Sequence, residues 1–102
     1  MQTLTIDIET YSDIDIKKSG VYPYAESENF QVLLFGYAFD NGPVKVIDLA
    51  QGEELPKFIL ESLYDDSVVK TAFNANFEIT CLSKHLGYNL PADQWQCTMV
   101  KA

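Results

Sequence analysis

The residues from Thr3 to Glu9 alternate strictly between polar and apolar side chains, and no other feature of the sequence limits the fold as strongly. In an extended chain the aliphatic residues of this segment point to one side and the polar residues point to the other. A strand with one buried face and one polar face is therefore expected near the start of the chain. Its polar face carries two carboxylates, Asp7 and Glu9.

The rest of the chain divides into segments with recognisable periods. Apolar runs bounded by turn residues predict strands, and apolar residues at helical spacing predict helices. We expect a buried strand over Gln31–Phe39, a turn over Asp40–Pro43, an antiparallel strand over Val44–Leu49, a helix over Glu53–Tyr64, a strand over Ser67–Phe73 and a helix over Asn76–Leu86 that Gly87 ends. This order of strands and helices predicts an α/β fold.

Two regions have no clear period. The segment from Asp13 to Asn29 mixes charged residues with Gly, Pro and Tyr, which predicts a long connection with at most a short helical turn. A further helix is expected to begin near Thr98, and the chain reaches Ala102 within it. Because no linker or repeat is visible before this point, we expect residues 1–102 to form one partial domain.

The composition limits the possible functions. Hydrophobic residues make up 47% of the chain, which supports a packed interior. The 7 basic residues against 15 acidic residues give a net charge of -8. This balance argues against a broad surface for phosphate binding, so any contact with nucleic acid is expected to be local or mediated by a metal.

Cysteine usage and hydropathy indicate a location. Cys81 and Cys97 match neither a disulfide framework nor the spacing of a zinc site, so we expect reduced thiols in a cytoplasmic setting. The amino terminus has no basic stretch followed by an apolar run, and no segment approaches the roughly 20 apolar residues of a membrane span. Neither secretion nor insertion into a membrane is expected.

The paired carboxylates are candidates for chemistry. Residues two apart on one face of a strand lie about 6.5 Å apart at their Cα atoms, so Asp7 and Glu9 can converge on one cation. Hard divalent ions such as Mg²⁺ prefer oxygen ligands, and two ions about 3.5 to 4 Å apart stabilise both the attacking and the leaving oxygen of phosphodiester hydrolysis. The alternative is that the pair belongs to an ordinary solvent-exposed strand face.

Glu78 could add a third carboxylate. It falls in the first turn of the helix after the strand over Ser67–Phe73, where it could be aimed at the carboxyl end of the sheet. The alternative is that the helix dipole alone favours an acid at this position. His85, further along the same helix, could be a ligand or base, or else a surface or packing residue. Most aromatic residues are best explained as core, whereas Tyr11, directly after the acidic pair, is a candidate for stacking on a base.

Four sequence blocks occur in order along the chain. The first, Asp7-Ile8-Glu9-Thr10-Tyr11, resembles the Asp-x-Glu motif of DEDD-type 3′-to-5′ exonucleases, and Asn74-Ala75-Asn76-Phe77-Glu78 resembles their second motif. Together with Gly20–Tyr24 and Trp95–Met99, these blocks resemble the start of family A DNA polymerases of phages and prophages. The resemblance covers essentially the whole chain.

The resemblance implies an α/β, RNase H-like fold: a mixed sheet in which strands 1 to 3 are antiparallel and a further strand is parallel, with flanking helices. It implies two Mg²⁺ or Mn²⁺ ions and removal of the 3′-terminal nucleotide from single-stranded DNA by water, as proofreading during DNA replication inside a bacterial host cell. The partners would be the 3′ end of the DNA and the remainder of the polymerase chain.

The resemblance also assigns roles to residues. Asp7 would bridge both metals, Glu9 would bind the more tightly held ion and orient the attacking water, and Glu78 would help to hold the other ion. Thr10 and Tyr11 would line the pocket for the terminal nucleotide.

The second motif carries one further role and one departure. Asn74 would support this motif and contact the substrate. The motif usually ends in Asp, so Glu78 adds a methylene group that could displace the second metal. The third motif, a Tyr or His followed four residues later by Asp, does not occur before the chain ends, and neither does a polymerase domain. We therefore expect weak metal binding and little or no hydrolysis from this chain alone.

Three other functions fit the sequence. The chain could be an inert RNase H-like scaffold that only supports a polymerase, or an acidic domain that binds other proteins. It could also come from a free-standing exonuclease of the same fold that trims RNA or short oligonucleotides.

Overall fold

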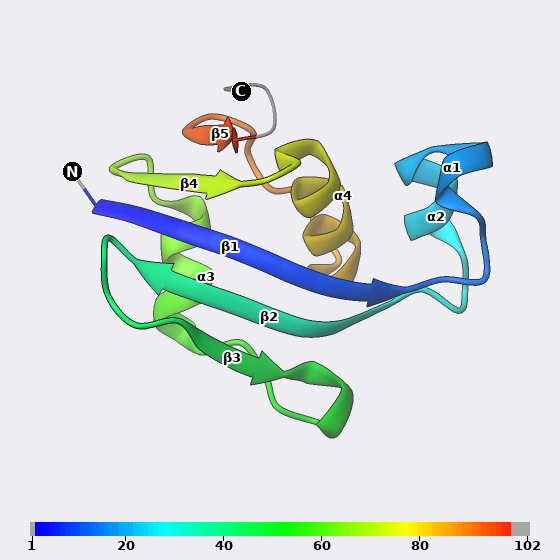
Figure 1. Ribbon diagram of the computed structural model, residues 1–102, viewed down its shortest axis with the longest axis horizontal. Coiled ribbons are helices and arrows are strands. Elements are labelled where there is room, and N and C mark those ends of the chain that lie inside the picture. Colours follow the sequence, from blue (N-terminus) through cyan, green and yellow to red (C-terminus); the bar gives the residue numbers. More distant parts are fainter. Residues whose placement is uncertain (1, 99–102) are drawn as a thin grey trace.

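The computed structural model describes residues 2–98, which form a five-stranded sheet with α3 and α4 packed against one face (Figure 1). The strands are β1 (Gln2–Tyr11), β2 (Gln31–Phe39), β3 (Lys45–Asp48), β4 (Val68–Ala72) and β5 (Trp95–Cys97). The helices are α1 (Ile16–Ser19), α2 (Val21–Glu26), α3 (Lys57–Tyr64) and α4 (Ala75–Leu86), with a short 3-10 helix η1 (Leu49–Gln51). Across residues 2–98, every helix is too short or too polar to cross a membrane.

The sheet is mixed, with the strand order β3-β2-β1-β4-β5. Strand β2 is antiparallel to both β1 and β3, whereas β4 is parallel to both β1 and β5. The central position of β1 places the segment with the strongest alternation in the middle of the sheet. The predicted α/β fold, with three antiparallel strands and a parallel one, is confirmed.

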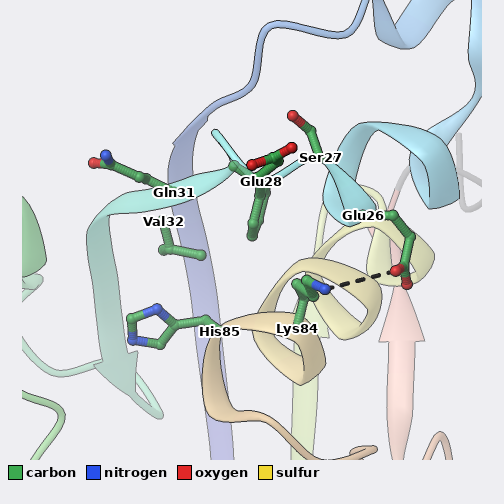
Figure 2. Close-up of a pocket in the computed structure, with 8 residues that line it drawn as sticks. Glu26, Ser27, Glu28, Gln31, Val32, Lys84 and His85 are labelled. Carbon is green, nitrogen blue, oxygen red and sulfur yellow. Dashed lines mark ion pairs between the residues drawn. The ribbon is translucent and has the colours of Figure 1, made fainter.

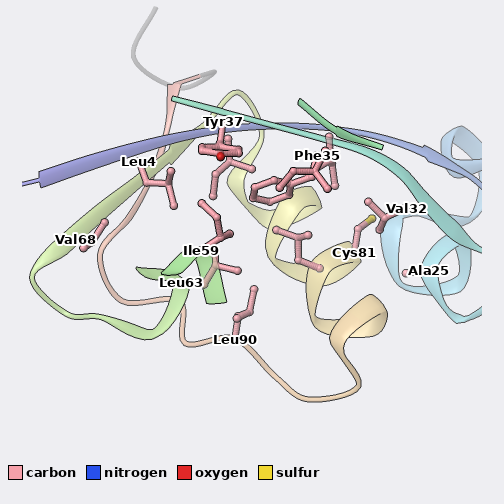
Figure 3. Packing of buried hydrophobic residues seen from close by; sticks show 14 residues of the cluster. Leu4, Ala25, Val32, Phe35, Tyr37, Ile59, Leu63, Val68, Cys81 and Leu90 are labelled. Atoms are coloured by element: carbon pink, nitrogen blue, oxygen red, sulfur yellow. The ribbon is translucent and has the colours of Figure 1, made fainter. Parts of the chain in front are cut away.

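The alternation in β1 decides which face of the sheet is covered. Leu4, Ile6 and Ile8 are buried, whereas Asp7 and Glu9 are exposed on the other face. Figure 3 shows the core side chains that fill the space between the sheet and the two longer helices. The fully buried hydrophobic members of this core are Leu4, Phe35, Ile59, Leu63, Cys81 and Leu82.

The connection after β1 is more ordered than the sequence predicted. The expected long loop with at most one helical turn contains two helices, α1 and α2. Asp15 caps α1, because its side chain accepts a hydrogen bond of 2.9 Å from the Lys17 backbone. Gly20 joins the two helices at φ 85° and ψ 175°, a region that essentially only glycine adopts. Helices of 4 and 6 residues are too short to show a helical period, which is why the pattern missed them.

Other boundaries also differ from the expectation. The helix predicted from Glu53 begins only at Lys57, because Pro56 is extended (φ -62°, ψ 155°) and disfavours a helical conformation in the residue before it. Strand β5 was not predicted, since a strand of 3 residues is too short to show an alternation. The helix expected from Thr98 onward falls on residues 99–102, which lie outside the described residues.

The end of α4 was predicted correctly. Gly87 follows the helix in the left-handed region (φ 85°, ψ 9°) and donates its backbone hydrogen bond to the Ser83 carbonyl at 2.9 Å. A residue with a Cβ atom is disfavoured in this conformation, so glycine ends the helix at this point.

Replacing Gly20 with alanine should lower the free energy of unfolding by about 1 to 3 kcal/mol, because the new Cβ would be strained by its own backbone. No neighbouring atom lies within 4 Å of that Cβ, so the loss would come from the backbone alone. Gly87→Ala is the matched comparison, and it should cost about 1 kcal/mol in its milder left-handed conformation. Urea denaturation followed by circular dichroism measures both values. A Gly20→Ala protein as stable as the wild type would contradict the role given to Gly20.

Candidate active site

The candidate acids lie where β1 continues beyond its parallel neighbour. Strand β4 pairs with β1 only from Gln2 to Thr5 and ends at Ala72. The part of β1 that carries Asp7 and Glu9 is paired with β2 on one side. On its other side this part of β1 has no strand partner among residues 2–98 and lies next to α4, which follows β4 in the chain.

Helix α4 begins next to this edge of β1. After β4 the chain turns through Phe73 and Asn74, and the helix starts at Ala75. The Asn74 carbonyl accepts backbone hydrogen bonds from Phe77 (2.9 Å) and Glu78 (3.3 Å), which closes the first turn. Glu78 therefore enters the protein interior from this turn, with 6% of its surface exposed.

The carboxyl group of Glu78 lies in an unfavourable place for a negative charge. Its Oε2 atom is buried and has no hydrogen-bond partner among residues 2–98. Burial and then the negative charge of Asp7 raise the pKa of Glu78 to about 7, against an opposing hydrogen bond from the Asn74 backbone. Asp7 and Glu78 come from distant parts of the sequence, and the fold brings their carboxyl groups within range of each other's charge.

An open hollow of about 270 Å³ lies beside Asp7. Its walls come from β1, from the end of β4 and from the residue after β5, and its lining residues are Thr5, Ile6, Asp7, Thr71, Ala72, Phe73 and Thr98. The Thr98 hydroxyl donates a hydrogen bond of 3.3 Å to the Ala72 carbonyl, which holds the two strand ends together. Phe73 is 70% exposed, so the hollow has an apolar rim next to an acid.

A divalent cation fits the chemistry of Asp7 and Glu78. The buried Oε2 atom of Glu78 lacks a partner, and a positive charge beside it would relieve its repulsion with Asp7. Glu9 is exposed on the same strand face as Asp7. In the part of the chain that the structure describes, no group of three or more His, Cys, Asp or Glu side chains is arranged to hold a metal ion. The fit therefore rests on Asp7 and Glu78.

The residues assigned to the substrate pocket lie in different settings. Thr10 follows a register shift in the pairing of β1 with β2, and its Oγ1 atom shares a hydrogen bond of 2.8 Å with the hydroxyl of Tyr24. Tyr11 ends β1 with 52% of its surface exposed. Asn74 is half-buried and makes no capping hydrogen bond with its side chain. Of the three, Tyr11 presents the largest free surface.

Tyr24 is a residue to which the sequence interpretation gave no role. It contacts Thr10 through its hydroxyl and Phe77 through its ring, with 6.1 Å between the ring centroids. Its signal in the sequence is its place in the Gly20–Tyr24 block, which was noticed only through the resemblance. Because this region has no apolar period, the sequence pattern did not predict α2 or its contacts.

His85 lies away from the candidate acids. It is in the last turn of α4 and lines a second hollow of about 450 Å³ together with Glu26, Glu28 and Lys84 (Figure 2). Lys84 forms an ion pair with Glu26 at 3.6 Å. Burial lowers the pKa of His85, which favours the neutral ring at neutral pH. The structure does not bring His85 into the hollow that Asp7 lines.

The fold is that of RNase H-like exonucleases, and solved structures with this fold cover nearly the whole chain. NrnC of Brucella melitensis, in a structure bound to pGG, matches with a TM-score of 0.67 and 19% identity over 96% of this chain and 41% of its own. The EXD2 exonuclease domain matches with a TM-score of 0.63 and 17% identity over 97% of this chain and 45% of its own. These similarities confirm the predicted RNase H-like fold.

The sequence is related to a DNA polymerase of Bacillus phage SP02. The two are 56% identical over 102 residues, which is 100% of this chain and 16% of the polymerase. This relationship confirms the resemblance to phage DNA polymerases that the four sequence blocks indicated. No family model matches the chain.

Glu78→Gln should change how stability depends on pH. The folded pKa of Glu78, about 7, exceeds the ordinary value of 4.5, so the folded state binds more protons between these limits and loses stability as the pH rises through them. Glutamine removes this loss. The stability gained by Glu78→Gln over the wild type should therefore be greater at about pH 8 than at about pH 4, by up to about 3 kcal/mol. Chemical denaturation at both values measures the difference, and a gain that is the same at both would contradict a buried, repelled carboxyl group.

Proposed function

We propose that this chain is the first part of the 3′-to-5′ exonuclease domain of a proofreading DNA polymerase. In the complete domain, this site would remove terminal nucleotides from single-stranded DNA inside a bacterial host cell. The observation that carries the proposal is the approach of Asp7 on β1 to Glu78 on α4 within an RNase H-like fold. The relationship to the phage polymerase supports the same function.

In this proposal the metal ligands are Asp7, Glu9 and Glu78, and the ions are Mg²⁺ or Mn²⁺. Bound ions of this kind stabilise the attacking and the leaving oxygen of phosphodiester hydrolysis. Glu78 is partly protonated near neutral pH because its pKa is about 7, so it must release a proton when it becomes a ligand. Burial and the neighbouring charge of Asp7 hold this proton on Glu78, and a bound cation would favour its release.

The substrate would be held by residues around the same acids. The exposed ring of Tyr11 is placed to stack on the terminal base, and Thr10 and Asn74 would line the remainder of the nucleotide pocket. A third motif, which supplies the missing ligand and base, would follow in the parent protein together with the polymerase domain. The net charge of -8 is compatible with this function, because DNA that is bound only at its 3′ end and through metal ions needs no broad basic surface.

One specific observation favours a second candidate function. The similar NrnC structure contains pGG, which suggests a parent exonuclease that degrades short oligonucleotides rather than the primer strand of a polymerase. The two functions share the acids and differ in substrate length. They can therefore be separated by the choice of substrate.

An extended chain, translated from the parent reading frame past the third motif, should shorten a 5′-labelled single-stranded DNA from its 3′ end in the presence of Mn²⁺. Asp7→Ala should lower the rate by at least about 100-fold, because it removes a carboxylate that would hold the ions. The assay should be repeated on an RNA of the same sequence and on a dinucleotide. Preference for the dinucleotide would favour the second candidate, and no cleavage of any substrate would favour an inert scaffold.

The 102-residue chain should bind Mn²⁺ more tightly as the pH rises through about 7, because Glu78 must lose its proton to bind the ion. Calorimetric titration at about pH 6 and pH 8 measures the change in affinity. Asp7→Asn should abolish specific binding. Glu61→Gln, an exposed acid on α3, is the matched control and should leave it unchanged. Equal affinity of the Asp7→Asn protein and the wild type would contradict the assigned site.

A further inference from the structure

Tyr24, on α2, is fixed by both its side chain and its backbone. Its hydroxyl shares a hydrogen bond of 2.8 Å with Thr10, and its carbonyl accepts a hydrogen bond of 2.8 Å from the Ser12 hydroxyl. Its ring packs edge-on against Phe30, with 5.9 Å between centroids, and tilted against Phe77, at 6.1 Å. Tyr24 therefore ties α2 to the end of β1 and to the first turn of α4.

The side-chain partners of Tyr24 are sequence neighbours of two of the candidate acids. Thr10 directly follows Glu9 in β1, and Phe77 directly precedes Glu78 in α4. The pairing of β1 with β2 shifts register between Glu9 and Thr10, so regular strand pairing is interrupted at this point. One side chain thus joins the two elements whose relative placement sets the spacing of Glu9 and Glu78.

We propose that Tyr24 is a positioning residue that holds the end of β1 and the start of α4 at the spacing that the divalent ions require. This inference rests on the proposed exonuclease function. In this role Tyr24 acts through its contacts with Thr10 and Phe77. Groups outside the first layer of a metal site control affinity by fixing the orientation of the ligands. The ring of Tyr24 fixes the position of α4, and its hydroxyl fixes the position of the β1 end.

The chain offers a close control for this role. Tyr22 lies two positions earlier on the same helix and is 63% exposed. Tyr22→Phe and Tyr24→Phe each remove one phenolic hydroxyl group from α2, but only Tyr24→Phe removes the hydrogen bond to Thr10. Thr10→Val removes that hydrogen bond from the other side and is the independent second variant.

The experiment compares Mn²⁺ affinity, thermal stability and exonuclease kinetics for the wild type, Tyr24→Phe, Thr10→Val, the double variant and Tyr22→Phe. Calorimetry uses this chain, and the kinetics use the extended chain. Tyr24→Phe should weaken Mn²⁺ binding by about threefold to tenfold and lower kcat more than it raises KM. Thr10→Val should weaken Mn²⁺ binding to a similar degree, and the double variant should bind no more weakly than either single variant. Tyr22→Phe should match the wild type.

The outcomes separate this inference from the function on which it rests. If the wild type binds Mn²⁺ and the extended chain degrades DNA, but Tyr24→Phe changes only the melting temperature, Tyr24 is structural and the inference is overturned while the exonuclease function stands. Additive losses in the double variant would also overturn it, because the two hydroxyl groups would then act independently. If the wild type neither binds Mn²⁺ nor degrades DNA, the proposed function fails, and the positioning role fails with it.

Discussion

The structure depends on the unequal lengths of two parallel strands. Strand β1 runs from Gln2 to Tyr11, but its pairing with β4 stops at Thr5, and β4 itself ends at Ala72. Helix α4 begins beside the remaining length of β1, so a side chain from its first turn can meet the polar face of the central strand. Had the two strands been of equal length, a neighbouring strand would cover this edge of β1.

This arrangement buries the carboxyl group of Glu78, which is unfavourable for the stability of the fold. A buried carboxyl group with one oxygen atom, Oε2, unpartnered among residues 2–98, beside a second acid, opposes folding at neutral pH. The core includes fully buried residues such as Leu4, Phe35 and Leu82. Burial of their apolar surface stabilises the fold and offsets the unfavourable burial of Glu78. Under the proposed function a bound cation would relieve this unfavourable burial, so that stability is given up locally for metal binding.

The sequence predicted the parts of the fold that have long periods. The alternation of Thr3–Glu9 and the helical spacing of Asn76–Leu86 each span enough residues to define a buried face, and both elements were found. Helices α1 and α2 and strand β5 were missed because they are too short to carry a period, and their positions depend on tertiary contacts such as those of Tyr24. The sequence motifs identified Asp7 and Glu78 as candidate ligands. Their proximity depends on how β1 and α4 pack, so only the folded structure shows it.

Whether Asp7 and Glu78 share a site can be decided by measuring the pKa of Glu78 by NMR of its carboxyl carbon, in the wild type and in Asp7→Asn. We expect a pKa of about 7 in the wild type and a lower value in Asp7→Asn that still exceeds 4.5 because burial persists. Addition of Mg²⁺ should lower the pKa in the wild type. A Glu78 carboxyl group that titrates near 4.5 and responds to neither the substitution nor the ion would show that the two acids do not share a site.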